Sequence, residues 1–310
     1  MEAHRSLGGQ PSIGLEPIAV TLDAVNVTAA RVAEILTRTS GFLRDVCSHS
    51  LQPYRGCSFG HALCGVACYV QHNGILTRGA PWGSFLEVRE NAAEAYRATA
   101  PRERNWARKS RGRFGIFLSS STEPFLPQER KFGVTRAVLD AMRDEPPDFL
   151  ILQTHSHQVA DHAALLMQLA ARTELRVHLS IETDRERLEG LPPHASSIAD
   201  RFAALETLAT AGIRTVVTVS PLLPIADPDA FFARIARHAS AVVIDHFIEG
   251  DGTPDGHRTL ATALPAAMEA IEPISASLAY REQIVRLAER HLPGRVGVSR
   301  EGFAGRYRPA

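Results

Sequence analysis

From Phe114 onward, short apolar runs alternate with stretches in which apolar residues recur at helical spacing. Near-continuous apolar runs are typical of parallel strands buried on both faces, and the stretches between them are typical of amphipathic helices. The predicted strands are 114–119, 149–153, 175–181, 213–219 and 241–246. The predicted helices between them are 133–144, 159–172, 196–211 and 228–238. With one short strand before the cysteine-rich segment, this pattern predicts about six β/α units, three-quarters of a closed eight-fold barrel.

The flanking segments carry weaker patterns. Residues 1–25 are rich in Gly and Pro and predict irregular structure, whereas Thr28 and the apolar positions after it predict a capped helix over 28–40. The segments further along are predicted as a helix at 88–100, a polar basic connector at 101–113, helices at 258–271 and 278–292, and a strand at 295–298. We therefore expect an α/β fold of three parts. These are an N-terminal flank (1–45), a partial (β/α)6 TIM-like barrel (46–250) and a C-terminal helical extension (251–310).

Composition narrows the class of protein. Hydrophobic residues make up 45% of the 310 residues and charged residues 22%, which excludes a disordered chain. The 34 basic and 34 acidic residues balance to a net charge of zero, so a broadly nucleic-acid-coating surface is not expected. The sequence has neither a membrane-spanning apolar run nor an N-terminal signal-peptide pattern, and the cytoplasm is the expected location.

The four cysteines lie close together in the sequence, at Cys47, Cys57, Cys64 and Cys68. A disulfide framework would spread them along a secreted chain, and structural cysteines would scatter. A cluster of soft thiolates in a cytosolic protein indicates zinc or an iron–sulfur cluster instead. We expect these cysteines above the carboxyl ends of the strands, where loops of parallel α/β folds carry the chemistry. The polar residues predicted to face the same cavity are Ser119, Ser120, Ser121, Thr122, Glu123, Thr154, His155, His157, Ser180, Glu182, Ser220, Asp245, His246 and Glu249.

These residues resemble those of a known family. The segment PYRGCSFGHALCGVACY (53–69) resembles the cluster loop (54–72) of radical S-adenosylmethionine (SAM) enzymes, in particular the spore photoproduct lyase-like, "DNA repair photolyase" branch. Three further segments resemble that branch in the family order. They are SSSTEPFLPQERKFGVTRAVLDAM (119–142), HLSIETDRERLEGLPPHASSIADRF (178–202) and LATAGIRTVVTVSPLLPIAD (208–227). The resemblance covers about residues 50–250 and implies a partial barrel.

The sequence departs from the family pattern at three places. The cysteines have the spacing Cys-x6-Cys-x3-Cys in place of Cys-x3-Cys-x2-Cys, and His61 falls where the usual spacing would put the second cysteine. We take Cys57, Cys64 and Cys68 as the ligands because Tyr69 follows Cys68 as a tyrosine follows the last family cysteine. Glu123 replaces an aspartate, and Thr-His-Ser at 154–156 replaces Thr-Lys-Ser, which removes a cation expected near the SAM carboxylate.

The resemblance implies the cofactors and the reaction. Three thiolates hold a [4Fe–4S] cluster whose open iron binds SAM. One electron from a low-potential donor of the flavodoxin or ferredoxin type then cleaves SAM to methionine and a 5′-deoxyadenosyl radical, which abstracts hydrogen from the substrate. By analogy with the branch, the substrate is a nucleic-acid lesion; radical modification of RNA or a peptide is the alternative. No membrane partner is expected.

The resemblance also implies roles for individual residues. Tyr69 lines the adenine side, and Ser120, Ser121, Thr122 and Glu123 hold the methionine end of SAM. Ser180 and Glu182 bind the ribose hydroxyls, His155 lies near the SAM carboxylate, and Arg201 pairs with that carboxylate. Cys47 is a candidate hydrogen donor near the radical.

Three alternatives stay open from the sequence. Cys57, His61, Cys64 and Cys68 form a reasonable zinc set, as in a zinc-stabilised nucleic-acid-binding protein. His155 and His157, with Asp245 and His246, resemble the metal site of a barrel hydrolase. The basic residues of 101–113, with Trp106 to stack on a base, form a candidate phosphate-contacting patch. These basic residues are Arg102, Arg104, Arg108, Lys109, Arg111 and Arg113.

Overall fold

The computed structural model describes residues 25–310. The expectation for residues 1–25 therefore falls almost wholly outside the described residues. The strands are β1 (Asn26–Ala30), β2 (Leu36–Arg38), β3 (His49–Leu51), β4 (Tyr54–Gly56), β5 (Phe85–Arg89), β6 (Gly115–Leu118), β7 (Phe149–Thr154), β8 (Glu174–Ser180), β9 (Thr215–Val219), β10 (Ala241–Ile244) and β11 (Val296–Val298).

The longer helices alternate with the strands of the main sheet. They are α3 (Ala92–Arg111), α5 (Val134–Asp144), α6 (Ala163–Ala170), α7 (Ile198–Thr210), α8 (Pro228–His238) and α12 (Leu278–His291). The short α-helices are α1 (Leu63–Val66), α2 (Gly74–Thr77), α4 (Glu129–Phe132), α9 (Phe247–Gly250), α10 (His257–Leu260), α11 (Leu264–Glu269) and α13 (Ser299–Phe303). The 3-10 helices are η1 (Gly41–Asp45), η2 (Ser58–His61), η3 (Tyr69–His72) and η4 (His157–His162).

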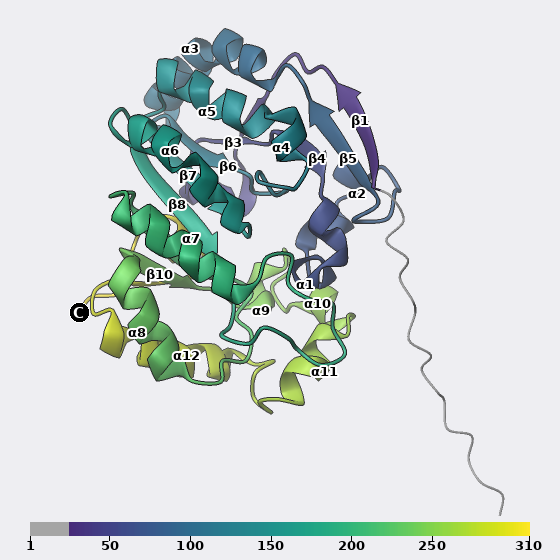
Figure 1. Ribbon diagram of the computed structural model, residues 1–310, viewed down its shortest axis with the longest axis vertical. Helices are drawn as coiled ribbons and strands as arrows, with labels where there is room; N and C mark the ends of the chain where they lie inside the picture. The colour runs from purple at the N-terminus through teal and green to yellow at the C-terminus, as the bar shows by residue number, and fades with distance from the viewer. Residues whose placement is uncertain (1–24) are drawn as a thin grey trace, which may run out of the picture.

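The main sheet has the strand order β11-β10-β9-β8-β7-β6-β3-β2. The run from β3 through β6 to β10 is parallel and sequential, which confirms the six predicted β/α units of a partial barrel. The predicted strand at 295–298 extends this run, because β11 pairs in parallel with β10. Figure 1 shows α5, α6, α7 and α8 following one another over the outer side of the sheet.

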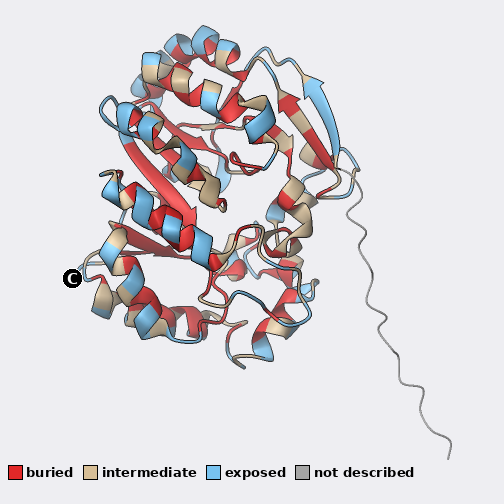
Figure 2. Ribbon diagram, viewed as in Figure 1, coloured by how far each residue is buried: buried red, intermediate tan, exposed pale blue. Residues whose placement is uncertain are grey.

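Strand alternation gives the sheet two buried faces. Leu150 and Leu152 of β7 face the helices in the larger apolar cluster, whereas Phe149 and Ile151 face inward in a second cluster. The strands are accordingly buried along nearly their whole length (Figure 2). The apolar runs in the sequence predicted these strands correctly, because a strand that is buried on both faces is apolar at nearly every position.

The predicted helix over 28–40 is wrong. β1 instead pairs in parallel with β5 in a three-stranded sheet of order β1-β5-β4, and β2 pairs antiparallel with β3 at the edge of the main sheet. Pairing with distant strands overrides the weak local helical spacing here.

The predicted connector 101–113 is also wrong over most of its length. α3 runs from Ala92 to Arg111 with Pro101 inside it. The charged face that suggested a loop is held by ion pairs to neighbouring elements, including Arg104 with Glu145 and Arg108 with Asp148. No helix in residues 25–310 is both long and apolar enough to cross a membrane.

Candidate active site at the mouth of the barrel

The start of the cysteine loop is tied to the barrel by the residues of the PYRGC segment. The Tyr54 hydroxyl donates to the Glu129 carboxylate, which also accepts hydrogen bonds from the backbone N–H groups of Thr135 and Arg136, each at 3.0 Å. Gly56 has a φ of +85°, and a Cβ there would lie 2.3 Å from the Phe85 carbonyl oxygen, so only glycine fits. These contacts fix where Cys57 enters the site.

The three candidate ligands sit on successive short helical turns rather than on an extended loop. Cys57 is the N-cap residue of η2, Cys64 lies in α1, and Cys68 is the N-cap residue of η3. Burial raises the pKa of Cys57 to about 12 and that of Cys68 to about 11, and the pKa of Cys64 is raised too, by burial and then by the neighbouring Cys57. None of these thiols forms a disulfide, and a negative charge on one raises the pKa of another. Their ionised forms would therefore need a positively charged partner, and a soft metal centre that binds thiolates would supply it.

The described residues do not gather the zinc ligands of the alternative hypothesis. Within residues 25–310, no three His, Cys, Asp or Glu side chains converge on one point where a single metal ion would sit. His61 lies against the backbone of Gly83, where an added Cβ would be 2.8 Å from Nε2. A [4Fe–4S] cluster needs no such convergence because each thiolate binds a different iron. Cys57, Cys64 and Cys68 are the type of donor that such a cluster takes.

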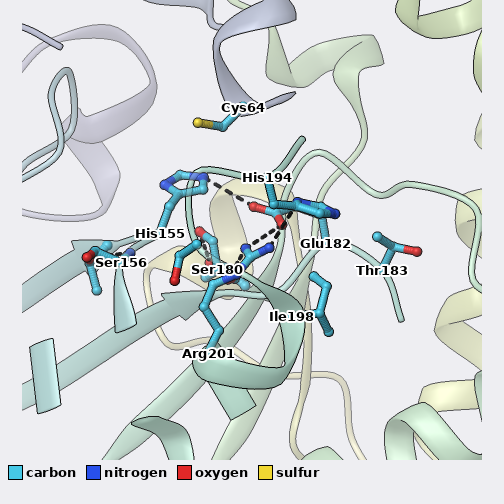
Figure 3. A network of polar contacts seen from close by, with 12 residues as sticks. Cys64, His155, Ser156, Ser180, Glu182, Thr183, His194, Ile198 and Arg201 are labelled. Carbon is cyan, nitrogen blue, oxygen red and sulfur yellow. Dashed lines mark hydrogen bonds and ion pairs between the residues drawn. The ribbon is translucent and has the colours of Figure 1, made fainter. Parts of the chain in front are cut away.

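Below the cysteine loop lies a cavity lined by Cys64, His155, Glu182, His194, Ser196 and Arg201, among others. Figure 3 shows Cys64 on the opposite side of this space from Glu182, with His155 at its edge. Arg201 is only 2% exposed. Its Nη1 donates to Glu182 Oε2 and to the Ser180 carbonyl oxygen, both at 2.7 Å. The network therefore places an ionised carboxylate, that of Glu182, in the wall of the cavity.

His194 completes this network as a neutral ring. Its Nε2 lies 3.0 Å from the Arg185 carbonyl oxygen, which can only accept, so Nε2 carries the proton and Nδ1 accepts from Arg201 Nη2 at 3.0 Å. Burial lowers the pKa of His194, in agreement with this tautomer. Both terminal nitrogens of Arg201 are thus engaged within the protein. Arg201 therefore positions Glu182. Its Nε–H has no partner among the described residues, and the predicted contact with the SAM carboxylate stays a prediction.

One carboxylate oxygen of Glu182 remains available as a hydrogen-bond acceptor. Among the described residues its Oε1 has no hydrogen-bond partner, although His155 Nε2 lies 3.3 Å away. Burial lowers the pKa of His155, so the ring is neutral at physiological pH. A buried carboxylate oxygen without a donor is costly. This site therefore fits a ligand that brings hydroxyl or ammonium hydrogens to Glu182.

The loop after β6 contributes the predicted residues Ser120 to Glu123. Ser120 accepts a hydrogen bond from Gln52 Nε2 at 2.8 Å, and its carbonyl accepts from the hydroxyl of Tyr69, which is 42% exposed. The backbone N–H of Ser121 donates to Gln52 Oε1 at 3.3 Å. The Thr122 hydroxyl donates to the Gly56 carbonyl. These contacts join the loop to the cysteine segment.

Glu123 is the second buried carboxylate of the site. It accepts hydrogen bonds from the Thr154 hydroxyl at 2.5 Å, the His155 N–H at 2.8 Å and the Phe125 N–H at 2.9 Å. Burial nevertheless raises the pKa of Glu123 to about 7. With both oxygens already occupied, Glu123 fixes the end of β7 and the backbone of His155.

Cys47 lies away from this cavity, and two candidate histidines, His157 and His246, are engaged by other partners. Cys47 precedes β3, at the opposite end of the barrel, where Sγ donates to the His49 carbonyl at 3.2 Å inside an apolar cluster. The His157 ring contacts Ser196 Oγ at 2.6 Å, and His246 Nε2 donates to the Ser275 carbonyl oxygen at 3.0 Å. The histidines of the hydrolase hypothesis are therefore not brought together.

Four of the six basic residues in this segment are paired with acidic neighbours. Arg102 pairs with Glu34 at 2.6 Å, and Arg113 pairs with Glu174 at 2.8 Å. Trp106 is covered by Arg38, whose guanidinium lies 4.0 Å from the ring centroid. Among the described residues only Lys109 and Arg111 of this segment have no acidic partner, so two basic side chains remain for the phosphate-contacting hypothesis.

Two polar residues of the barrel interior were missed from the sequence. Gln153 and Thr218 occur inside otherwise apolar strands, FLILQT and TVVTV, and a polar residue at an inward strand position was the available signal. Ser180 Oγ, which was predicted, contacts Gln153 Nε2 at 2.7 Å and Thr218 Oγ1 at 2.9 Å.

The molecule is thus a partial parallel α/β barrel with a thiol-bearing loop over the carboxyl ends of its strands. The chain shares this fold with spore photoproduct lyase. One similar structure, a double mutant "with bound AdoMet and dinucleoside spore photoproduct", has a TM-score of 0.57 at 15% identity over 88% of this chain and 81% of that chain. Another, "complexed with dinucleoside spore photoproduct", has a TM-score of 0.58 at 16% identity over 88% and 81%. No protein-family profile and no curated protein sequence matches the chain.

Proposed function

We propose that the protein is a radical SAM enzyme. The observation that carries this proposal is a set of three mutually interacting thiols, one buried and two half-buried. One of them, Cys64, lines a barrel-mouth cavity that contains a buried carboxylate with a free oxygen. The resemblance of residues 53–69 to a radical SAM cluster loop and the shared fold of spore photoproduct lyase support the same conclusion.

In this proposal Cys57, Cys64 and Cys68 hold a [4Fe–4S] cluster, and SAM occupies the cavity beneath it. When bound, the cluster supplies the electron that cleaves SAM to methionine and a 5′-deoxyadenosyl radical. Glu182 Oε1 accepts hydrogen bonds from SAM, and Arg201 keeps Glu182 ionised and oriented. His155 stands at the edge of the cavity where the family has a lysine, and it binds SAM as a neutral ring. The surrounding apolar residues exclude water from the radical.

The test is anaerobic reconstitution of the full chain with iron and sulfide, followed by SAM and dithionite. We expect a brown protein that forms 5′-deoxyadenosine, and a Cys64→Ala variant that does not. His61→Ala separates the cluster from the zinc alternative, because it keeps the iron if the three cysteines are the ligands. A wild-type protein that takes up no iron, or that binds iron and SAM without forming 5′-deoxyadenosine, contradicts the proposal.

For the substrate, we propose a nucleic-acid lesion. The supporting observation is that similar solved structures of spore photoproduct lyase are described as holding a dinucleoside lesion. The assay supplies the reconstituted protein with dinucleoside spore photoproduct and follows its conversion. Turnover of an RNA or a peptide in place of the lesion would support the alternative substrate classes. A low-potential flavodoxin or ferredoxin would replace dithionite in the cell.

A further inference from the structure

The interior of the barrel is closed at its lower end by an apolar floor. Phe117, Ile151, Val216 and Val243, from four strands, form an inward-facing cluster with Phe303 of α13. The His178 ring packs into this floor 5.9 Å from the Phe303 ring. Burial lowers the pKa of His178 to about 3, so the ring is neutral. A ligand therefore reaches the interior only from the mouth, where the cavity lies.

Directly above this floor the inward positions become polar. Two residues further along each strand stand Gln153 on β7, Ser180 on β8 and Thr218 on β9, and Asp245 follows β10. We call these four residues the polar layer. Gln153 Nε2 donates to Ser180 Oγ at 2.7 Å and to Thr218 Oγ1 at 3.0 Å. Four consecutive strands thus present polar groups at one depth of the barrel.

Asp245 joins this arrangement through Ser220, which lies two residues after Thr218. The Ser220 hydroxyl donates to Asp245 Oδ2 at 3.3 Å. The polar layer adjoins the cavity, because the cavity-lining Arg201 donates to the Ser180 carbonyl oxygen at 2.7 Å, and Pro221, which follows Ser220, also lines the cavity. A group bound beneath SAM would therefore contact the polar layer.

Two acceptors of the polar layer have no donor. Among residues 25–310, neither Gln153 Oε1 nor Asp245 Oδ1 has a hydrogen-bond partner, and both atoms are buried. Asp245 is 5% exposed. Buried polar atoms in folded proteins are nearly always paired, with protein, water or ligand. Because the two unpaired atoms are both oxygens that accept, the missing partner is one that donates.

Building on the proposed function, we propose that the polar layer is the specificity site for the substrate and binds the N–H edge of a neutral nucleobase through Gln153 Oε1 and Asp245 Oδ1. The polar layer contains no Lys or Arg and one acidic residue, so an anionic phosphate is repelled and stays outside the barrel. This arrangement turns the base toward the reactive centre and leaves the backbone of the nucleic acid at the mouth.

The test uses the reconstituted full chain with SAM bound and two probes. The first probe is dinucleoside spore photoproduct, and the second is the same molecule methylated on its ring imide nitrogens, which removes the N–H donors. We expect the methylated probe to bind the wild type about tenfold to a hundredfold more weakly, as for the loss of a hydrogen bond to a charged or buried group. Gln153→Leu and Asp245→Ala, which remove the acceptors, should weaken binding of the first probe by a similar factor and lose the discrimination between the two.

The controls separate this inference from the proposed function. SAM affinity and 5′-deoxyadenosine formation without probe should be unchanged in both variants, and Asp229→Asn, on the exposed face of α8, should bind both probes like the wild type. Equal affinity of the wild type for the two probes, or no saturable binding of either, overturns the polar layer as a base-binding site even where SAM cleavage is intact. Loss of SAM cleavage in the variants overturns it as well, because the residues then serve SAM. A wild type that binds the probes but cleaves no SAM refutes the proposed function alone.

Discussion

Arg201 Nη1 and Glu182 Oε2 lie 2.7 Å apart, and both side chains are at most 5% exposed. Burial alone would raise the pKa of Glu182, but Arg201 and His155 hold it below its ordinary value. Glu123, which has no such ion pair, has its pKa raised by the same burial. The two buried carboxylates of the site therefore differ in pKa. Glu182 stays ionised, whereas Glu123 titrates near pH 7.

Removing one partner of this pair should be more damaging than removing both. Arg201→Met leaves Glu182 as an uncompensated buried charge, and we expect it to lower the free energy of unfolding by about 3–5 kcal/mol. In the double variant Glu182→Gln/Arg201→Met, the second substitution should restore part of that loss. Urea unfolding of the four proteins in the double-mutant cycle measures the coupling. Additive losses would show that the pair does not act as a unit.

The cysteines offer an internal control for the cluster. Cys57→Ala, Cys64→Ala and Cys68→Ala should each abolish retention of iron after anaerobic reconstitution and desalting, because each removes one of three ligands. Cys47→Ala should keep the iron of the wild type, since Cys47 lies in the apolar cluster at the other end of the barrel. Iron and sulfide analysis of the four variants decides the ligand set. If Cys47→Ala loses its iron while Cys57→Ala retains it, Cys47 and not Cys57 is a ligand of the cluster.

The strands of the barrel were predictable because each is apolar on both faces and each helix between them has one apolar stripe. The helix predicted over 28–40 and the connector at 101–113 failed for the opposite reason. In both segments the local pattern is weak, and the outcome depends on partners far along the chain, namely β5 for β1 and Glu145 or Asp148 for the arginines of α3. Long-range pairing of this kind leaves no periodic trace in a single sequence.

The site was predictable in its residue types and less so in its contacts. Strand order alone brings the loops after β6, β7 and β8 to one end of the barrel, and the cysteine loop resembled a known motif. The sequence suggested Arg201 as a ligand of SAM, and the structure adds that its guanidinium orients Glu182 and His194. The role of such a side chain depends on the residues it contacts in the folded protein, and spacing along the sequence does not predict those contacts.

Glu103 is another buried carboxylate, and no pattern in the sequence singled it out. It lies in α3, is 4% exposed, and accepts from Arg38 Nε at 2.8 Å and from His49 Nε2 at 3.0 Å. Burial opposes ionisation, but these donors and Arg102 together lower the pKa of Glu103 to about 2. This stabilisation is present above the ordinary pKa and is lost as the pH falls toward the folded value.

Glu103→Gln should therefore destabilise the protein by about 2 kcal/mol at pH 7, because it leaves three donors without an anionic acceptor. Glu94→Gln on the same helix is the matched control. Glu94 pairs with Arg31 in an exposed contact, so its loss should cost about 0–1 kcal/mol. Urea unfolding at pH 7 compares the two variants. Equal stability of both would mean that Glu103 contributes no more than a surface pair.

Asp245 should impose a pH dependence of the opposite sign. Burial raises its pKa from 3.8 to about 6, against the opposing effect of the Ser220 hydroxyl, which donates to Oδ2. Below the unfolded value the carboxyl is protonated in both states. Between the two values only the unfolded chain loses the proton, so the folded state becomes less stable as the pH rises toward 6, and above that pH the loss is constant.

Relative to Asp245→Asn, the wild type should thus lose about 2–3 kcal/mol of unfolding free energy between pH 4 and pH 6.5. Urea unfolding of both proteins at half-unit steps measures this difference, in which other titrating groups cancel. Asp229→Asn is the control, since hydrogen bonds from His291 and Arg290 lower the pKa of Asp229 and its contribution has the other sign. A difference between wild type and Asp245→Asn that stays flat across this range would mean that the Asp245 carboxyl is solvated or paired in the folded protein. It would then have no free oxygen for a substrate.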